Sequence, residues 1–181
     1  MALITKNNVG RIAERIVSNE LEYRGFRVSD LNSDGTAANA DLLAVKSGKT
    51  WQIQVKGATQ GPQDKRWWIQ YGHGNPEIMR RTQPVFNRRT SFYTADIVIL
   101  VAVRSPKEYQ CIVLPVKMAE RAAQLNLDRG YRTLKKDGTP KKAGKIWVHI
   151  TRSPKARRES DLLDKEWKIL ADCNEKWEIL D

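Results

Sequence analysis

The chain has 181 residues, of which 40% are hydrophobic and 29% charged, and its formal net charge is +11 at pH 7. This length suits one compact domain with a sizeable core, which needs neither a structural metal nor a disulfide to fold. We find no apolar run that would span a membrane and no apolar leader, and Cys111 and Cys173 are more consistent with free thiols than with a bridge, so a cytoplasmic protein is expected.

The basic residues are concentrated in two stretches. Residues 57–95 carry six basic and two acidic side chains, and residues 129–158 carry eleven and one, whereas residues 159–181 carry three and eight. Charge concentrated in this way favours binding of a polyanion over a merely solubilising surface. The sequence therefore predicts one domain over the whole chain, with a basic insertion at about 57–94 and a basic loop at about 129–144.

The apolar pattern of the first third predicts a helix followed by strands. Apolar residues recur at helical spacing over about residues 8–24, and Gly25 is suited to end that helix. The next strands are short, and a turn at Ser47 and Gly48 joins the last two as a hairpin. These three predicted strands cover about residues 26–28, 40–45 and 51–55.

The second half of the chain supplies the centre of the predicted sheet. Residues 57–94 show no clear period, whereas residues 95–103 are nearly all apolar and predict a central strand that is buried on both faces. A neighbouring antiparallel strand, a helix, a last strand and a last helix are predicted at about 110–114, 116–125, 146–150 and 160–171. This order predicts an α/β fold in which helices flank one central mixed β-sheet.

Three polar side chains meet at one end of the predicted hairpin. Asp41 lies near the start of its first strand, and Gln54 and Lys56 lie near the end of its second strand. Gln54 and Lys56 are two residues apart and therefore leave the same face of the strand. Carboxylate and carbonyl oxygens suit a hard cation such as Mg²⁺, which activates water and stabilises charge on a phosphate. The ammonium group of Lys56 is suited to orient that water or to neutralise the developing charge.

This arrangement resembles the PD-(D/E)xK, or restriction-endonuclease-like, nucleases, which include restriction enzymes, archaeal Holliday-junction resolvases and certain intron-encoded homing endonucleases. The resemblance covers about residues 8–56 and includes the helical sequence GRIAERIVSNELEYRGFRV. It implies a restriction-endonuclease-like core in which Asp41 is the central metal ligand, Lys56 the catalytic lysine and Glu14 an auxiliary ligand. Glu20, near the centre of the apolar stripe of the helix, is the reserve candidate. The implied cofactor is Mg²⁺, with Mn²⁺ as a substitute.

Two positions depart from the pattern of this class. The sequence Asn-Ala-Asp, which ends at Asp41, stands where the nominal motif has Pro-Asp, and Gln54 stands where it has an acidic ligand. A neutral amide binds Mg²⁺ more weakly, so the site is expected to need more metal, to favour Mn²⁺ or to be silent, although some restriction and homing enzymes are active with this Q-x-K form. The predicted metal ligands are Asp41, Gln54, Glu14 and the carbonyl group of Val55.

Basic residues in the two stretches are predicted to contact DNA, because Lys and Arg bind phosphates and Arg also reads guanine edges. The predicted function is a metal-dependent endonuclease that cleaves double-stranded DNA, first as a type II restriction enzyme. Intron homing, junction resolution or repair, and a non-catalytic DNA-binding protein with a nuclease fold are the alternatives. Because a duplex has two strands to cut, a homodimer or higher even oligomer is expected. The predicted DNA contacts are Lys65, Arg66, Arg80, Arg81, Arg88, Arg89, Lys135, Lys136, Lys141 and Lys142.

Overall fold

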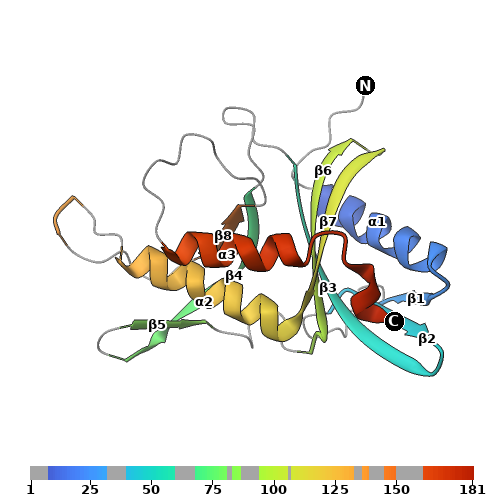
Figure 1. Cartoon of the computed structure of the whole chain (residues 1–181), viewed down its shortest axis with the longest axis horizontal. Coiled ribbons are helices and arrows are strands. Elements are labelled where there is room, and N and C mark those ends of the chain that lie inside the picture. Colours follow the sequence, from blue (N-terminus) through green and yellow to red (C-terminus); the bar gives the residue numbers. More distant parts are fainter. Residues whose placement is uncertain are drawn as a thin grey trace.

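The described part of the chain contains two β-sheets, three α-helices and one short 3-10 helix (Figure 1). The structure is a computed structural model, and it describes residues 8–31, 40–59, 68–80, 83–86, 94–105, 107–132, 136–138, 145–149 and 161–181. The helices are α1 (Val9–Tyr23), α2 (Val116–Arg132) and α3 (Asp161–Asp172). None of the described helices is both long and apolar enough to cross a membrane.

The first sheet is mixed and has the strand order β1-β2-β3-β6-β7. Its neighbouring strands pair antiparallel, except that β3 and β6 run parallel from Ile53 opposite Ile97 to Thr59 opposite Val103. The α1 helix packs on one face of this sheet, whereas α2 and α3 pack on the other. The predicted α/β class, with a central mixed sheet between helices, is therefore confirmed. The strands are β1 (Arg27–Asp30), β2 (Leu42–Lys46), β3 (Lys49–Thr59), β6 (Ile97–Ser105) and β7 (Glu108–Pro115).

The β6 strand forms the centre of the core, as its apolar sequence predicts. Every residue from 97 to 103 is at most 2% exposed. Because side chains alternate along a strand, Ile99 and Val101 pack in the cluster beneath α1, whereas Val98 and Leu100 pack in the cluster beneath α2 and α3. One strand thus contributes to both hydrophobic clusters.

A second sheet, with the strand order β5-β4-β8, corrects the prediction of one mixed sheet. Residues 57–94, for which the sequence shows no clear period, contain β4 (Trp68–Arg80) and β5 (Gln83–Phe86). The last predicted strand, β8 (Lys145–His149), pairs antiparallel with β4 and does not join the central sheet. The register of β4 shifts in both of its pairings, and its glycines and proline interrupt the alternation by which strands are recognised.

The α2 helix packs against strands of both sheets. Its buried face belongs to the cluster that contains Leu100 of β6 and Ile146 of β8. The side-chain carbonyl of Gln124 accepts a hydrogen bond of 2.9 Å from the backbone N–H of Phe86, the last residue of β5. This helix extends to Arg132, so the start of the predicted basic loop is helical.

The interface between α2 and α3 contains a buried carboxylate. Glu166 is 1% exposed, accepts a hydrogen bond of 3.0 Å from Asn126 and lies 3.4 Å from the guanidinium group of Arg129. Burial raises the pKa of Glu166 to about 7, against the opposing influence of Arg129 and then Asn126. The two helices are therefore joined by a polar contact within an apolar interface.

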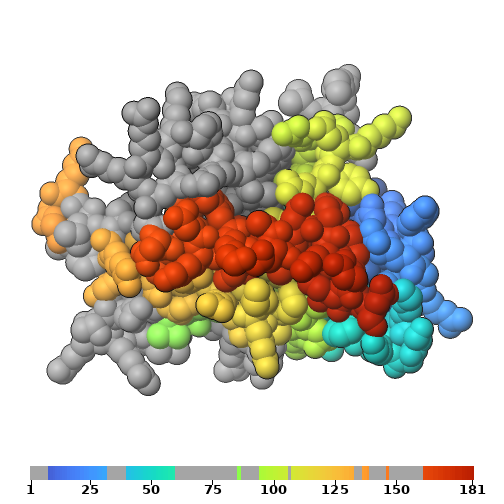
Figure 2. Space-filling model, viewed as in Figure 1, coloured from blue at the N-terminus to red at the C-terminus, as the bar shows by residue number. Residues whose placement is uncertain are grey.

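The segment after α3 pairs with the outer edge of β7, and in Figure 2 it continues the band that α3 forms across one face of the molecule. The N–H of Val113 donates to the carbonyl of Cys173 at 2.9 Å, and the carboxylate of Glu175 accepts from the N–H of Cys111 at 2.6 Å. A 3-10 helix that was not predicted, Trp177–Leu180, follows this segment. Both cysteines are buried and free, in clusters on opposite faces of the sheet, which confirms the prediction of free thiols.

The α1 helix approaches β3 very closely at Gly57. A Cβ at this position would lie 2.5 Å from the Cβ of Ala13 and 3.0 Å from the carbonyl oxygen of Val9. Any side chain here would push the helix away, so glycine allows the backbones to approach. This contact sets the position of Glu14 relative to the strand that carries Gln54 and Lys56.

We expect Gly57→Ala to lower the free energy of unfolding by about 1–3 kcal/mol, because its methyl group overpacks the contact between α1 and β3. Urea denaturation followed by circular dichroism measures this change. The matched control is Gly10→Ala in α1, where a Cβ meets nothing within 4 Å. The control is expected to be neutral or slightly stabilising, since alanine favours helix. Equal stability of Gly57→Ala and wild type would contradict the close approach.

Candidate active site

The candidate site lies where the chain enters β2 beside β3. The N–H of Asp41 donates to the carbonyl of Ile53 at 2.8 Å, and the carbonyl of Asp41 accepts from the N–H of Leu31 at 2.9 Å. These bonds fix the backbone of Asp41 between two neighbouring segments. The hairpin that was predicted from the sequence therefore brings Asp41 beside Gln54 and Val55.

Among the described strands, none pairs with the β2-facing side of β3 beyond Ile53, and we refer to this stretch as the open edge of β3. That residue is the last in β3 to pair with β2, whereas the pairing with β6 continues to Thr59. The backbone carbonyl of Ile53 points toward the β2 side of β3. Residues two apart direct their backbone N–H and C=O groups to the same side of a strand, so those of Val55 also point to that side, but beyond the first residue of β2. The carboxylate of Asp41 takes up this space and accepts the N–H of Val55 at 2.7 Å.

Gln54 is 3% exposed, and its side-chain nitrogen bridges two oxygen atoms. Nε2 donates to Oδ2 of Asp41 and also contacts the carbonyl oxygen of Val55 at 3.4 Å. One amide nitrogen thus stands between a carboxylate oxygen and a carbonyl oxygen at the open edge of β3.

Glu14 approaches these groups from α1 and is partly buried. Burial raises the pKa of Glu14, and the negative charges of Asp41 and then Asp30 raise it further, whereas Lys56 and Arg11 lower it. The carboxylate of Glu14 therefore lies within electrostatic reach of both Asp41 and Lys56. The helix is on the face of the sheet into which Ile53 and Val55 point. The side chains of Gln54 and Lys56 leave β3 on the opposite face of the sheet. The site therefore combines Glu14, from one face, with Gln54 and Lys56, from the other face, at one edge of β3.

The oxygen atoms around Gln54 form a donor set that suits a hard divalent cation. Asp41 and Glu14 supply carboxylates, Val55 a carbonyl, and Gln54 an amide oxygen. Within the described ranges, no three His, Cys, Asp or Glu side chains form a group that would hold a metal ion. A cation at this position would therefore depend on the amide and carbonyl oxygens as well. The location of Nε2, a donor between two oxygens, fits such a cation.

Glu20, the reserve candidate from the sequence, bonds elsewhere. Its carboxylate accepts the hydroxyl proton of Tyr109 at 2.7 Å and lies 3.4 Å from the guanidinium group of Arg24. This hydrogen bond is the main reason why the pKa of Tyr109 is raised to about 12. Glu20 therefore joins α1 to β7.

The predicted DNA contacts fall mostly outside the described residues. Arg80 is the last residue of β4, and Lys136 is exposed in a turn. The side chain of Arg80 lies outside the described part of the structure. The residues that lie outside the described ranges are Lys65, Arg66, Arg81, Arg88, Arg89, Lys135, Lys141 and Lys142.

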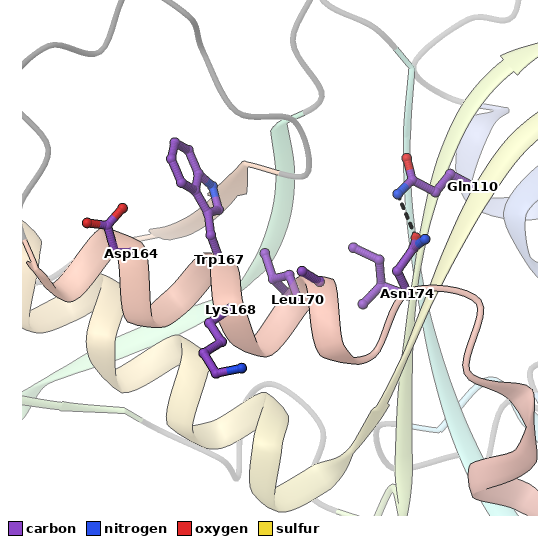
Figure 3. Close-up of a pocket in the computed structure, with 8 residues that line it drawn as sticks. Gln110, Asp164, Trp167, Lys168, Leu170 and Asn174 are labelled. Carbon is purple, nitrogen blue, oxygen red and sulfur yellow. Dashed lines mark hydrogen bonds between the residues drawn. The ribbon is translucent and has the colours of Figure 1, made fainter.

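A groove of about 480 Å³ lies between α3 and β7, away from the predicted site residues (Figure 3). The side chain of Trp167 stands up from α3 along it, and the amide of Gln110 donates to Asn174 at 2.6 Å at its other end. None of the residues that line this groove was singled out from the sequence. Its mixed apolar and polar lining has no spacing that a sequence pattern would show.

No protein-family model and no curated protein sequence matches the chain. Its fold does match a solved structure, that of the bacterial homing endonuclease I-Ssp6803I, with a TM-score of 0.55 and 14% sequence identity. The match covers 97% of this chain and 93% of that chain. At this low identity the likeness shows a shared nuclease-like fold, and it extends beyond the N-terminal part in which the sequence resemblance lies.

We expect Asp41→Asn to lower the pKa of Glu14 toward its ordinary value, because the substitution removes a negative charge that raises it. The ¹³C chemical shift of the Glu14 carboxyl group, followed across a pH titration, measures this change. Asp161→Asn, at an exposed position on α3, is the matched control and should leave the titration unchanged. An unchanged pKa of Glu14 in Asp41→Asn would mean that the two carboxylates do not interact.

Proposed function

We propose that the protein is a divalent-cation-dependent endonuclease that hydrolyses phosphodiester bonds in double-stranded DNA at a specific sequence. The observation that carries this proposal is the convergence of Asp41, Gln54 and Val55 at an open strand edge, with Glu14 within electrostatic reach. The similarity of nearly the whole fold to a homing endonuclease supports it. The net charge of +11 also supports a polyanionic substrate.

The residues of the site have distinct roles in this proposal. When bound, Mg²⁺ supplies an electrophile that activates water and stabilises negative charge on the phosphate. The N–H of Val55 holds the carboxylate of Asp41 at the position where it would bind the cation. Glu14, which lies within electrostatic reach of Asp41, would add a second carboxylate to the ligands of the cation. The ammonium group of Lys56 neutralises charge that develops on the phosphate during the reaction.

The second sheet and the basic loop bind the DNA in this proposal. The β4 strand, which ends at Arg80, follows β3 in the chain and contacts it. Phosphate contacts by Lys and Arg supply affinity, and contacts to base edges supply specificity. The two cuts that sever a duplex favour a homodimer or a higher even assembly.

Two biological roles are consistent with sequence-specific cleavage. The sequence alone favours type II restriction, whereas the similarity to a homing endonuclease along 97% of the chain supports intron homing as a second candidate. Digestion of a complex DNA followed by sequencing of the ends separates them. Ends at a short palindrome indicate restriction, and ends at one long site indicate homing. Cleavage of four-way junctions alone would indicate resolution, and DNA binding without any cleavage would indicate a non-catalytic protein.

We expect Asp41→Asn and Lys56→Met each to reduce DNA cleavage by roughly 100-fold or more, because each removes a charge that acts on the transition state. Gel-shift assays should show DNA binding within a few fold of wild type. The controls make the same chemical changes in the exposed pair Asp172→Asn and Lys168→Met on α3, and both should cleave normally. Full activity of Asp41→Asn or Lys56→Met would refute the assignment of the site.

DNA binding is expected to weaken steeply with salt, since each neutralised phosphate of duplex DNA releases about 0.9 counterion. Replacing Arg80 and Arg81, or Arg88 and Arg89, with alanine should lower affinity and reduce the slope of log K against log salt by about 1–2 per pair. Fluorescence anisotropy at several salt concentrations measures both. The control replaces Lys165 and Lys168 of the acidic C-terminal region and should keep the wild-type slope. Salt-insensitive binding would point to another partner.

A further inference from the structure

The amide of Gln54 faces two groups that can only accept hydrogen bonds. Oδ2 of Asp41 and the backbone carbonyl oxygen of Val55 both contact Nε2. A primary amide has an N–H₂ side that donates and a C=O side that accepts. With the N–H₂ side toward these oxygens both contacts are attractive, whereas with the C=O side toward them three oxygens would repel one another.

A cation at the same position requires the opposite orientation. Hard divalent ions bind carboxylate and carbonyl oxygens, and an amide ligates them through its oxygen rather than its N–H₂ group. Since Gln54 is 3% exposed, solvent cannot compensate an amide that faces the wrong way. The orientation of the side chain is therefore coupled to whether a cation is present.

We propose that the N–H₂ group of Gln54 occupies the cation position of the metal-free site, and that the amide must rotate to present Oε1 before a cation binds. This inference rests on the cation site of the proposed function. The rotation breaks the contacts of Nε2 with Asp41 and Val55. Apparent affinity for the cation is lowered in proportion to the small fraction of molecules whose amide is already rotated.

This arrangement gives a physical reason for glutamine at a position where the nucleases that the N-terminal sequence resembles have a carboxylate. A third carboxylate beside Asp41 and Glu14 would meet two like charges in a partly buried site. The amide instead satisfies Asp41 while no cation is present. Gln54 thus stabilises the metal-free protein and weakens cation binding, and both effects come from the same contacts.

Thermal unfolding of Gln54→Glu tests the stability side of this proposal. Without divalent cations and at pH 8, the melting temperature of Gln54→Glu should be lower than that of wild type by roughly 3–10 °C. Adding Mg²⁺ or Ca²⁺ should raise the melting temperature of Gln54→Glu by more than it raises that of wild type. The variant has no amide N–H₂ group whose contacts must break before the cation binds. The matched control is Gln110→Glu, which also loses an amide donor to an oxygen but lies at the groove beside α3. The difference in melting temperature between Gln110→Glu and wild type should be the same with and without cation.

The side-chain amide resonances of Gln54 in ¹H–¹⁵N spectra of the wild-type protein test the rotation directly, and do so even if Gln54→Glu does not fold. We expect these resonances to show hydrogen-bonded protons without cation and to shift when Mg²⁺ or Ca²⁺ is added. Their loss in Gln54→Glu or Gln54→Ala assigns them.

The outcomes separate this inference from the proposed function. Cleavage in Mg²⁺ with unchanged Gln54 resonances overturns the rotation and leaves the nuclease proposal intact. Shifted resonances without cleavage of any DNA overturn the nuclease proposal and leave the rotation intact. A Gln54→Glu protein as stable as wild type without cation, with an equal response to cation, overturns the proposed role of the amide.

Discussion

The difference in length between β2 and β3 is the constraint on which the site depends. The β3 strand has 11 residues and β2 has 5, so the backbone of β3 beyond Ile53 loses its partner on one side. Buried backbone polar groups need partners. The carboxylate of Asp41 binds the N–H of Val55, and the amide of Gln54 contacts its carbonyl. The side chains proposed for chemistry are therefore also those that complete the interrupted sheet.

Close packing brings the remaining carboxylate to this edge. Gly57 has no side chain, and α1 therefore packs against the backbone of β3 at a distance that leaves no room for a Cβ. Burial and the charge of Asp41 then raise the pKa of Glu14, so its proton affinity follows from the packing of the helix. A single glycine beside the proposed catalytic lysine thus controls an electrostatic property of a residue more than forty positions earlier in the sequence.

The sequence predicts those elements whose burial is regular. The α1 helix, the hairpin at Ser47 and Gly48, and the doubly buried β6 are visible as simple periods, and the hairpin alone brings Asp41 to Gln54. The sequence does not predict the second sheet, because glycines, Pro76 and register shifts interrupt the alternation of apolar and polar residues in β4. In addition, the local pattern of a strand does not determine which other strand it pairs with. The bond from Val55 to Asp41 depends on where β2 begins, which apolar periodicity locates only approximately.

The covered edge of β7 limits how the protein can polymerise. Backbone bonds with Cys173 and Glu175 occupy the middle of that edge, so among the described residues β7 presents less bare backbone to a neighbouring strand than β1 does at the other edge. A growing ribbon of sheets needs two bare edges on each molecule, whereas a molecule with one bare edge joins one neighbour and stops. The short β1 strand carries Arg27 and Asp30 on its exposed positions, which makes indiscriminate joining still less favourable. A covered edge of this kind disfavours open-ended growth through this sheet.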